Sequence, residues 1–259
     1  MTKKELMNVA SEESLAVLNQ EYPKEQSFSR ILLPRITFLS QDRTEGKGKN
    51  MKVVAEAGTF ISERPNDAGE WEKEELGKEI DVQIFYHRRQ LRYWDATNES
   101  FVNSPIYDTD EDVIPLFQDK KEIARGTQKE LQAKYPALEG RKTSPLQDER
   151  VLYVIYGGEA FQMSIKGGSK WAFLTYSRKV NPSTVLTTIT SEEKENGSIT
   201  WNQMIFTEGS KISEKEAKEI IAKVGEIKTA ILAEKSYYQS MATAISLPEN
   251  ETDKEFKKF

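Results

Sequence analysis

The chain has 259 residues, of which 37% are hydrophobic and 31% charged, and its formal net charge at pH 7 is −5. It contains no cysteine and a single histidine, which excludes disulfides, thiolate zinc sites, cysteine nucleophiles and any metal site built on several histidines. No apolar run approaches the roughly 18 residues of a transmembrane helix, and the N-terminus lacks the apolar core of a signal peptide, so we expect a cytoplasmic protein that does not bind membranes.

The first third of the chain is predicted to contain a helical arm followed by strands. Residues 1–30 form the expected N-terminal helical arm, and Ile31–Ser40 is the first predicted strand, in which Pro34 suits a strand start. Gln41–Asn50 is a polar, basic loop with glycines, and Met51–Ser62 resumes an extended pattern. Glu63–Gly77 is strongly charged and is predicted to be a turn or loop.

The next segment concentrates aromatic and basic side chains in an otherwise acidic protein. Its period-two pattern indicates a strand with two different faces. One face is apolar and belongs in a core: Ile80, Val82, Ile84 and Tyr86. The other face mixes polar, aromatic and cationic groups and is expected to meet solvent: Gln83, Phe85, His87 and Arg89. Arg88–Gln90 is a candidate turn, after which Leu91–Asp95 would begin a return strand.

Residues 96–149 are rich in turn-forming and acidic residues and are interpreted as an insertion or long connection. Within them, Thr127 stands three residues before Glu130, which is the spacing of a capping box at the start of a helix. Pro136 would end this short helix.

The following region predicts two hairpins. Glu149–Ile165 holds two apolar segments around Gly157 and Gly158, and a second hairpin is expected over 184–206 across Asn196–Gly197. Between them, a short helix would begin with Ser169 as N-cap and pack side chains inward. The inward candidates are Trp171, Phe173 and Leu174.

A long helix is predicted near the C-terminus, over 213–238. Ser213 and Glu216 form a capping box, and apolar residues recur on one stripe from Ala217 to Leu232. The tail 241–259 is polar and is expected to be disordered.

These elements indicate a mainly β protein with added helices, in the α+β class. Several short strands, glycine-turn hairpins and helices near the chain ends favour a β-barrel, and the lack of regular strand–helix alternation argues against a doubly wound fold. We expect one barrel domain over 31–240, with an insertion near 96–149 and the long helix at its end.

No enzyme motif is present. The chain has no phosphate-binding loop, no dinucleotide-binding glycine motif and no H-E-x-x-H, and Asp108–Asp112 lacks the spacing and the glycine of an EF-hand. We therefore expect a non-catalytic protein without metal or cofactor. A metal-dependent nuclease that uses carboxylates distant in sequence is the least favoured alternative.

The residue types that bind single-stranded nucleic acid are present together. Such proteins combine a cationic groove that follows the phosphates with aromatic faces on which bases stack. The candidate binding residues are Arg35, Lys47, Lys49, Phe85, His87, Arg89, Arg92, Tyr93, Trp94, Lys166, Lys170 and Trp171.

Two other interpretations of these residues stay open. Aromatic residues on strands commonly pack against cross-strand neighbours, and arginines on an antiparallel strand commonly form a solvated face. Tyrosine, tryptophan and arginine are also the residues that dominate protein–protein interfaces, so an interaction module such as an inhibitor or adaptor is the second hypothesis.

Three segments resemble bacteriophage-type OB-fold single-stranded DNA-binding proteins. They are Leu33–Asn50, with its "PR-hydrophobic" start and basic glycine loop, Gly157–Tyr176, with its "IKGGS" step into a helix, and Ile199–Gly209. The resemblance implies an OB-like Greek-key barrel that coats or protects single-stranded DNA in phage replication or recombination, without catalysis or cofactor, in the host cytoplasm.

Many replication single-strand binders end in an acidic tail closed by phenylalanine that recruits replication or recombination proteins. This chain ends in Phe259, which is the corresponding partner-binding candidate, but lysines nearly balance the acids of its tail. A plain polar tail is therefore an equal alternative. The sequence also leaves the oligomeric state open, since the long helix is able to pack on its own barrel or on that of a second copy.

Overall fold

The structure is a computed structural model that describes residues 33–45, 52–66, 70–139 and 143–246. The predicted N-terminal arm (1–30), Lys47, Lys49 and the end of the tail with Phe259 lie outside the described residues. The expected single domain over 31–240 is divided into two compact units. Unit 1 comprises the described residues of 33–89 and 148–231, and unit 2 comprises those of 90–147 and 232–246.

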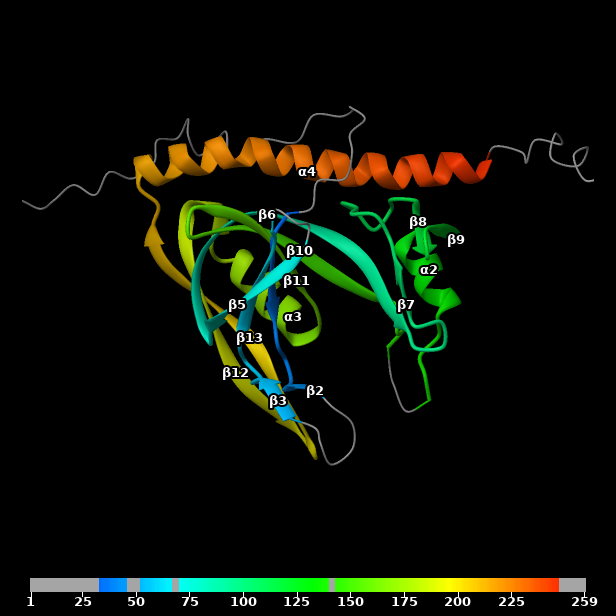
Figure 1. Ribbon diagram of the computed structural model, residues 1–259, viewed down its shortest axis with the longest axis horizontal. Coiled ribbons are helices and arrows are strands. Elements are labelled where there is room, and N and C mark those ends of the chain that lie inside the picture. Colours follow the sequence, from blue (N-terminus) through cyan, green and yellow to red (C-terminus); the bar gives the residue numbers. More distant parts are fainter. Residues whose placement is uncertain (1–32, 46–51, 67–69, 140–142, 247–259) are drawn as a thin grey trace, which may run out of the picture. The chain divides into compact units, whose positions relative to one another are not determined.

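The sheet of unit 1 follows the spatial order β5-β4-β1-β11-β10-β6-β12-β13 (Figure 1). Strands β1 and β11 pair in parallel, whereas the pairs β1–β4, β4–β5, β10–β11, β6–β12 and β12–β13 are antiparallel. The strands are β1 (Arg35–Phe38), β4 (Phe60–Pro65), β5 (Trp71–Gly77), β6 (Glu79–Asp95), β10 (Gln147–Tyr156), β11 (Glu159–Ile165), β12 (Val185–Asn196) and β13 (Ile199–Lys211). A separate ladder pairs β2 (Arg43–Glu45) with β3 (Lys52–Ala55).

Helix α3 (Gly167–Ser177) packs against the core of unit 1. Phe173 is fully buried, and its ring packs edge-on against Phe206 of β13 with centroids 5.5 Å apart. Tyr176 stacks on the same ring, and its hydroxyl lies 2.8 Å from that of Thr187. The predicted N-cap differs: Lys166 occupies that position, and the hydroxyl of Ser169 instead accepts a hydrogen bond from the backbone N–H of Met204. The short helix η2 (Pro182–Thr184) leads into β12.

The turn predicted at Arg88–Gln90 is wrong, because strand β6 continues through these residues. It runs unbroken for 17 residues; Glu79–Val82 pair with β12, and its last residues, from Arg92 on, pair with β7. The four consecutive residues Val82–Phe85 are all buried, so both faces of the strand are covered here. Because both faces are covered, the period-two pattern of the sequence did not correctly predict a solvated face for this part of β6.

Unit 2 continues from the end of β6 as an antiparallel meander. Its further strands are β7 (Ser100–Asn103), β8 (Ile114–Gln118) and β9 (Lys121–Gly126). Helix α2 (Gln128–Lys134) has the predicted capping box between Thr127 and Glu130. The core of unit 2 consists of Leu91, Val102, Tyr107, Ile114, Leu116, Leu131 and Leu146.

Helix α4 (Glu214–Ser246) extends eight residues beyond the predicted end at residue 238, so 241–246 are helical and not part of a disordered tail. The predicted capping box is present, because Glu216 N–H donates to the Ser213 hydroxyl and the Glu216 carboxylate accepts from Ser213 N–H. No helix among the described residues is long and apolar enough to cross a membrane.

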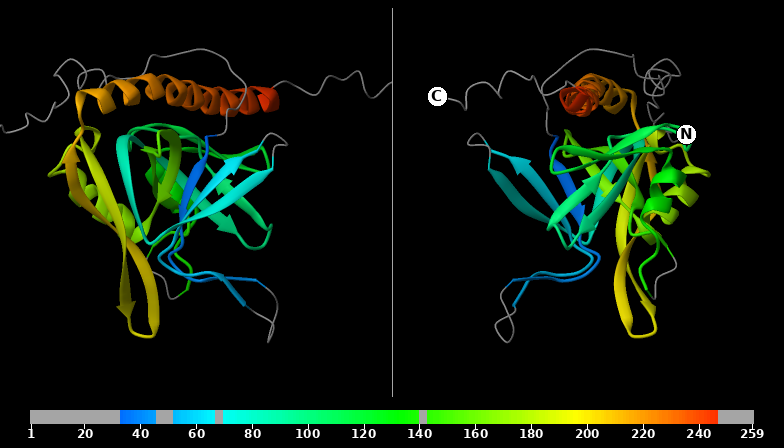
Figure 2. Two further views of the ribbon diagram at one scale, coloured as in Figure 1. Left: turned by 60° about the vertical axis from the view of Figure 1, so that its left-hand side comes forward. Right: turned by 90° about the vertical axis from the view of Figure 1, so that its right-hand side faces the viewer.

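The mainly β, α+β class is confirmed, but closure of a barrel is not found among the described strands. The nearest approach to closure is a single hydrogen bond from Asn202 N–H of β13 to the carbonyl of Ser40, just after β1 (2.8 Å). Beyond this point β12 and β13 continue as a long hairpin, separate from the β2–β3 ladder (Figure 2).

The segment Glu63–Gly77, predicted as a loop, contains most of the β4–β5 hairpin. Its charged residues pair across the two strands, as in Lys73–Glu63 (3.2 Å) and Arg64–Glu74 (3.5 Å). A strand with one solvated face tolerates such alternating charges, which composition alone does not distinguish from a loop.

Replacement of Phe173 by alanine should destabilise unit 1 by about 3–5 kcal/mol, because it removes a fully buried ring and leaves a cavity. Trp171→Ala on the same helix should change stability by about 0.5 kcal/mol or less, since that side chain is 61% exposed. Urea unfolding followed by far-ultraviolet circular dichroism compares the two. Equal effects would show that α3 does not pack as described.

Candidate nucleic-acid interface

The structure separates the predicted binding residues. Seven lie in unit 1, three in unit 2, and Lys47 and Lys49 are outside the described residues. Those in unit 1 are Arg35, Phe85, His87, Arg89, Lys166, Lys170 and Trp171, and those in unit 2 are Arg92, Tyr93 and Trp94.

Two of the candidates in unit 1 are engaged in packing. Phe85 is 5% exposed and packs against Tyr153 with ring centroids 6.5 Å apart, so the expectation that it faces solvent is wrong. Arg35 lies with its guanidinium 5.2 Å from the centre of the Trp71 ring on β5. Phe85 is thus a core residue, and Arg35 makes a cation–π contact with Trp71.

Arg89 and Lys170, both predicted to bind phosphate, are instead bound to Asp148. Arg89 is 8% exposed, and its Nε and Nη2 donate to the two carboxylate oxygens of Asp148 at 3.3 and 3.4 Å. Lys170 Nζ donates to the carbonyl and to Oδ2 of the same residue at 2.8 and 3.3 Å. We call these three residues the ion triad. It joins β6, β10 and α3 within unit 1, beside the points where the chain leaves for unit 2 and returns.

The ion triad keeps Asp148 charged. Burial raises the pKa of this carboxyl, but the hydrogen bond from Arg89 and the charges of Lys170 and Arg89 outweigh burial, so the net pKa is lower than usual. Because both cations already neutralise a buried carboxylate, they are poor candidates for binding phosphate.

His87 packs edge-on against Phe173, with ring centroids 5.2 Å apart, while part of its side chain remains exposed. Burial against this core is the main cause, and the charge of Arg150 the second, of a pKa lowered to about 4. The ring is therefore neutral at physiological pH and adds no positive charge to an interface.

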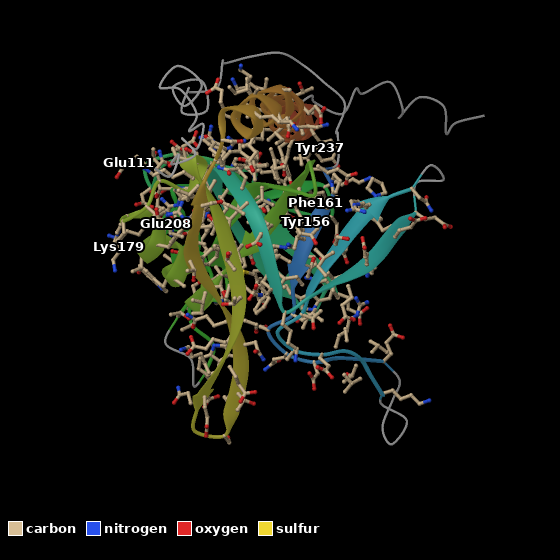
Figure 3. All side chains as sticks on the ribbon, turned by 90° about the vertical axis from the view of Figure 1, so that its left-hand side faces the viewer. Glu111, Tyr156, Phe161, Lys179, Glu208 and Tyr237 are labelled. Atoms are coloured by element: carbon tan, nitrogen blue, oxygen red, sulfur yellow. The ribbon has the colours of Figure 1, made fainter. Side chains whose placement is uncertain are left out.

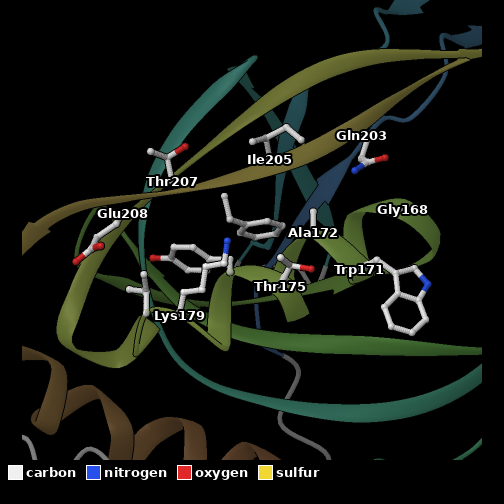
Figure 4. Close-up of a pocket in the computed structure, with 12 residues that line it drawn as sticks. Gly168, Trp171, Ala172, Thr175, Lys179, Gln203, Ile205, Thr207 and Glu208 are labelled. Carbon is white, nitrogen blue, oxygen red and sulfur yellow. The ribbon is translucent and has the colours of Figure 1, made fainter.

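Lys166 and Trp171 are exposed at the start of α3. Trp171 stands at one end of a groove of about 630 Å³ between α3 and β13, and Lys170 Nζ lies 5.7 Å from its ring centre (Figure 4). Of the predicted residues in unit 1, these two and His87 are exposed, and only Lys166 and Trp171 combine a cation with an exposed aromatic ring.

Unit 2 exposes an aromatic surface that is partly predicted and partly new. Trp94 of β6 is 47% exposed and is the cross-strand partner of Phe101 of β7, which is 43% exposed. The two rings meet edge to face with centroids 4.7 Å apart, and the guanidinium carbon of Arg92 lies 4.0 Å from the centre of the Phe101 ring. We call Arg92, Trp94 and Phe101 the aromatic platform.

The sheet holds the aromatic platform in a fixed geometry. Tyr93, the neighbour of Trp94, points to the opposite face and packs with Tyr135 beside the core of unit 2 (5.9 Å). The turn between β6 and β7 is ordered by Asp95, whose carboxylate accepts from Gln118 and from Asn98. The same hydrogen bonds, Gln118 first, lower the pKa of Asp95.

Sequence reasoning identified Arg92 and Trp94 but missed Phe101. The residues Asp95–Ser100, with asparagine and threonine between two extended segments, are typical of a hairpin turn. A hairpin at this point would have placed Phe101 opposite Trp94. This pairing was missed because residues 96–149 were interpreted as an insertion or long connection, with no strand assigned at Ser100–Asn103.

No group of three or more acidic or histidine side chains that could hold a metal ion occurs among the described residues. Comparison with known proteins gives no match to a family model, to a curated protein or to a solved structure.

Asp148→Asn should destabilise the protein by about 3–5 kcal/mol, because it leaves the buried charges of Arg89 and Lys170 uncompensated. Since the folded pKa of Asp148 is depressed, its stabilisation is complete above the ordinary carboxyl pKa near 4 and is lost as the pH falls through the lowered value. Urea unfolding between pH 3 and 7 should therefore show a smaller acid-induced loss in the variant than in the wild type.

The matched control is Glu193→Gln, which removes an exposed carboxylate from β12. Replacing the whole ion triad by apolar residues (Arg89→Met, Asp148→Leu, Lys170→Met) should recover most of the stability lost in Asp148→Asn, because no charge is then left buried. If Asp148→Asn is as stable as the control, Asp148 does not compensate the charges of Arg89 and Lys170 as described.

Proposed function

We propose that this protein binds single-stranded DNA without catalysing a reaction on it, and that it coats or protects strands in phage replication or recombination. The observation that carries the proposal is the aromatic platform, in which Trp94 and Phe101 are exposed together with the guanidinium of Arg92 beside them. The core of unit 2 contains neither ring, so both are left at the surface of the sheet.

The aromatic platform has the chemistry that an unpaired base and its phosphate require. Each base has an apolar face that stacks on an aromatic ring, and such stacking contributes roughly 1–3 kcal/mol per base. Arg92 supplies a cation beside the two rings, and its guanidinium lies over the Phe101 ring, so in this proposal it neutralises a phosphate next to a base stacked on Trp94. In a duplex the base faces are covered by their neighbours, so the surface suits single strands.

The strand order of unit 1 supports the same proposal. Its strands β6, β10 and β11, then helix α3, then the hairpin β12–β13 follow the chain order of an OB-fold: three strands, a helix and a final hairpin. The pairing of β12 with β6 is the one that an OB-fold makes between its fourth and first strands. In this comparison unit 2 occupies the loop between the first two strands, which is one of the loops that bind nucleic acid in OB-folds.

Unit 1 offers a second exposed contact. Trp171 and Lys166 at the start of α3 present an aromatic face and a cation to solvent. The aromatic platform nevertheless carries the proposal, because its three side chains contact one another and are held by a paired sheet.

Trp94→Ala should weaken the binding of fluorescein-labelled oligo-dT by about 5- to 150-fold, the equivalent of roughly 1–3 kcal/mol for one stacked base. Fluorescence anisotropy at 50 and 200 mM salt measures the affinity. Arg92→Ala should also reduce the slope of log affinity against log salt by about 0.7, because one phosphate contact is lost.

The matched control is Ile123→Ala, which removes an exposed apolar side chain (43%) from β9 of the same unit and should leave affinity unchanged. Arg89→Ala should lower stability, whereas Arg92→Ala should not. If wild-type protein neither shifts oligo-dT nor changes its tryptophan fluorescence at 50 mM salt, the DNA-binding proposal fails and the protein-interaction hypothesis takes its place.

A further inference from the structure

The outer edge of β13 carries main-chain groups whose direction is fixed by the β12–β13 hairpin. Asn196 and Ile199 flank a two-residue turn, so in this ladder the odd-numbered residues of β13 bond to β12. The even-numbered residues direct their N–H and C=O groups to the opposite edge. Asn202 and Met204 obey this rule, because their N–H groups donate to the Ser40 carbonyl (2.8 Å) and to the Ser169 hydroxyl (3.0 Å).

The next two even-numbered residues, Phe206 and Glu208, direct their main-chain groups to the same edge; Glu208 is exposed, whereas Phe206 is buried. Among the described residues none forms a main-chain or side-chain hydrogen bond with them on this edge. Both residues line the groove between α3 and β13. A short stretch of unpaired strand edge therefore lies beside a cavity.

The groove has the size of a ligand site and two different walls. Its volume of about 630 Å³ falls within the range of roughly 300–1,000 Å³ typical of binding pockets. Figure 4 shows Trp171 at one end, Thr175 and Ala172 along the helix wall, and Ile205 along the strand wall. Near Trp171, the absence of a side chain at Gly168 leaves room for Gln203, because a Cβ at position 168 would clash with the Oε1 of Gln203.

The charges at the other end of the groove are of both signs. Lys179 and Glu208 lie on the same side of the molecule, from the end of α3 and from β13 (Figure 3). Arg178, next to Lys179, is also exposed, so the helix end is cationic. The groove therefore offers a site for a carboxylate near Lys179, while Glu208 disfavours a chain of phosphates.

We propose that this edge of β13 binds an extended peptide segment of a partner protein as an additional strand. The N–H and C=O groups of Phe206 and Glu208 form main-chain hydrogen bonds with the peptide, because an unpaired strand edge binds an extended backbone. An apolar side chain of the peptide packs between Ala172 and Ile205, and an acidic residue lies near Lys179. The proposed partner surface is distinct from the aromatic platform, so its failure would leave DNA binding untouched.

The test uses variants that alter the edge without altering the β12–β13 ladder. Glu208→Pro removes an N–H that does not bond to β12, and proline is tolerated at such edge positions. Glu208→Gln removes the charge but keeps the N–H. Thr175→Trp fills the groove from α3. Thr200→Pro removes an even-numbered N–H of the same strand outside the groove and is the matched control.

The probe is a phage-displayed random nonapeptide library panned on the immobilised full-length protein, followed by anisotropy with the enriched peptides labelled with fluorescein. We expect peptides that alternate β-branched or aromatic residues and contain an acid. Glu208→Pro and Thr175→Trp should weaken their binding at least tenfold, whereas Glu208→Gln and Thr200→Pro should change it less than threefold.

Three results would overturn the proposal. The first is no enrichment of peptides, or enriched peptides that bind Glu208→Pro as tightly as the wild type. The second is a wild-type dimer in light scattering that becomes monomeric in Glu208→Pro, which would assign the edge to a second copy of the chain. The third is a loss of oligo-dT binding in Glu208→Pro and Thr175→Trp, which would assign the groove to DNA.

Discussion

The unbroken strand β6 is the constraint on which the rest of the structure depends. Its 17 residues serve two cores in succession, with Ile84 buried in that of unit 1 and Leu91 in that of unit 2. Its neighbour changes along its length, from β12, which pairs with Glu79–Val82, to β7, which pairs with Arg92–Asp95. This change of partner makes the insertion a continuation of the sheet and places Trp94 opposite Phe101.

The ion triad lies next to this change of partner. Burying Arg89 and Asp148 is unfavourable unless the charges are paired, and the lysine from α3 completes the pairing. As a consequence, Arg89 and Lys170, which were predicted from the sequence to bind phosphate, are bound to Asp148 within the protein. Charge composition therefore overstates the phosphate-binding capacity of unit 1, and exposure, not residue type, decides which cations are left for a ligand.

Local patterns predicted local structure well. The capping boxes at Thr127 and Ser213 and the hairpin across Gly157 follow from short-range chemistry, and the structure has them. What failed depends on tertiary contacts. Phe85 was assigned to solvent because period-two alternation assumes that one face is uncovered, whereas Tyr153 and its neighbours cover both. The charged strand β5 resembled a loop, since its stabilisation comes from pairing with β4, which no local pattern encodes.

An acidic protein that binds DNA must gain affinity from short-range contacts. With a net charge of −5, long-range attraction of a polyanion is weak, and the basic side chains act only within a Debye length of about 10 Å at 0.1 M salt. Stacking has no such dependence, because it rests on the contact of apolar ring faces. Under the proposed function, the aromatic platform, with two rings and one guanidinium, would supply these short-range contacts while the whole-molecule charge opposes binding.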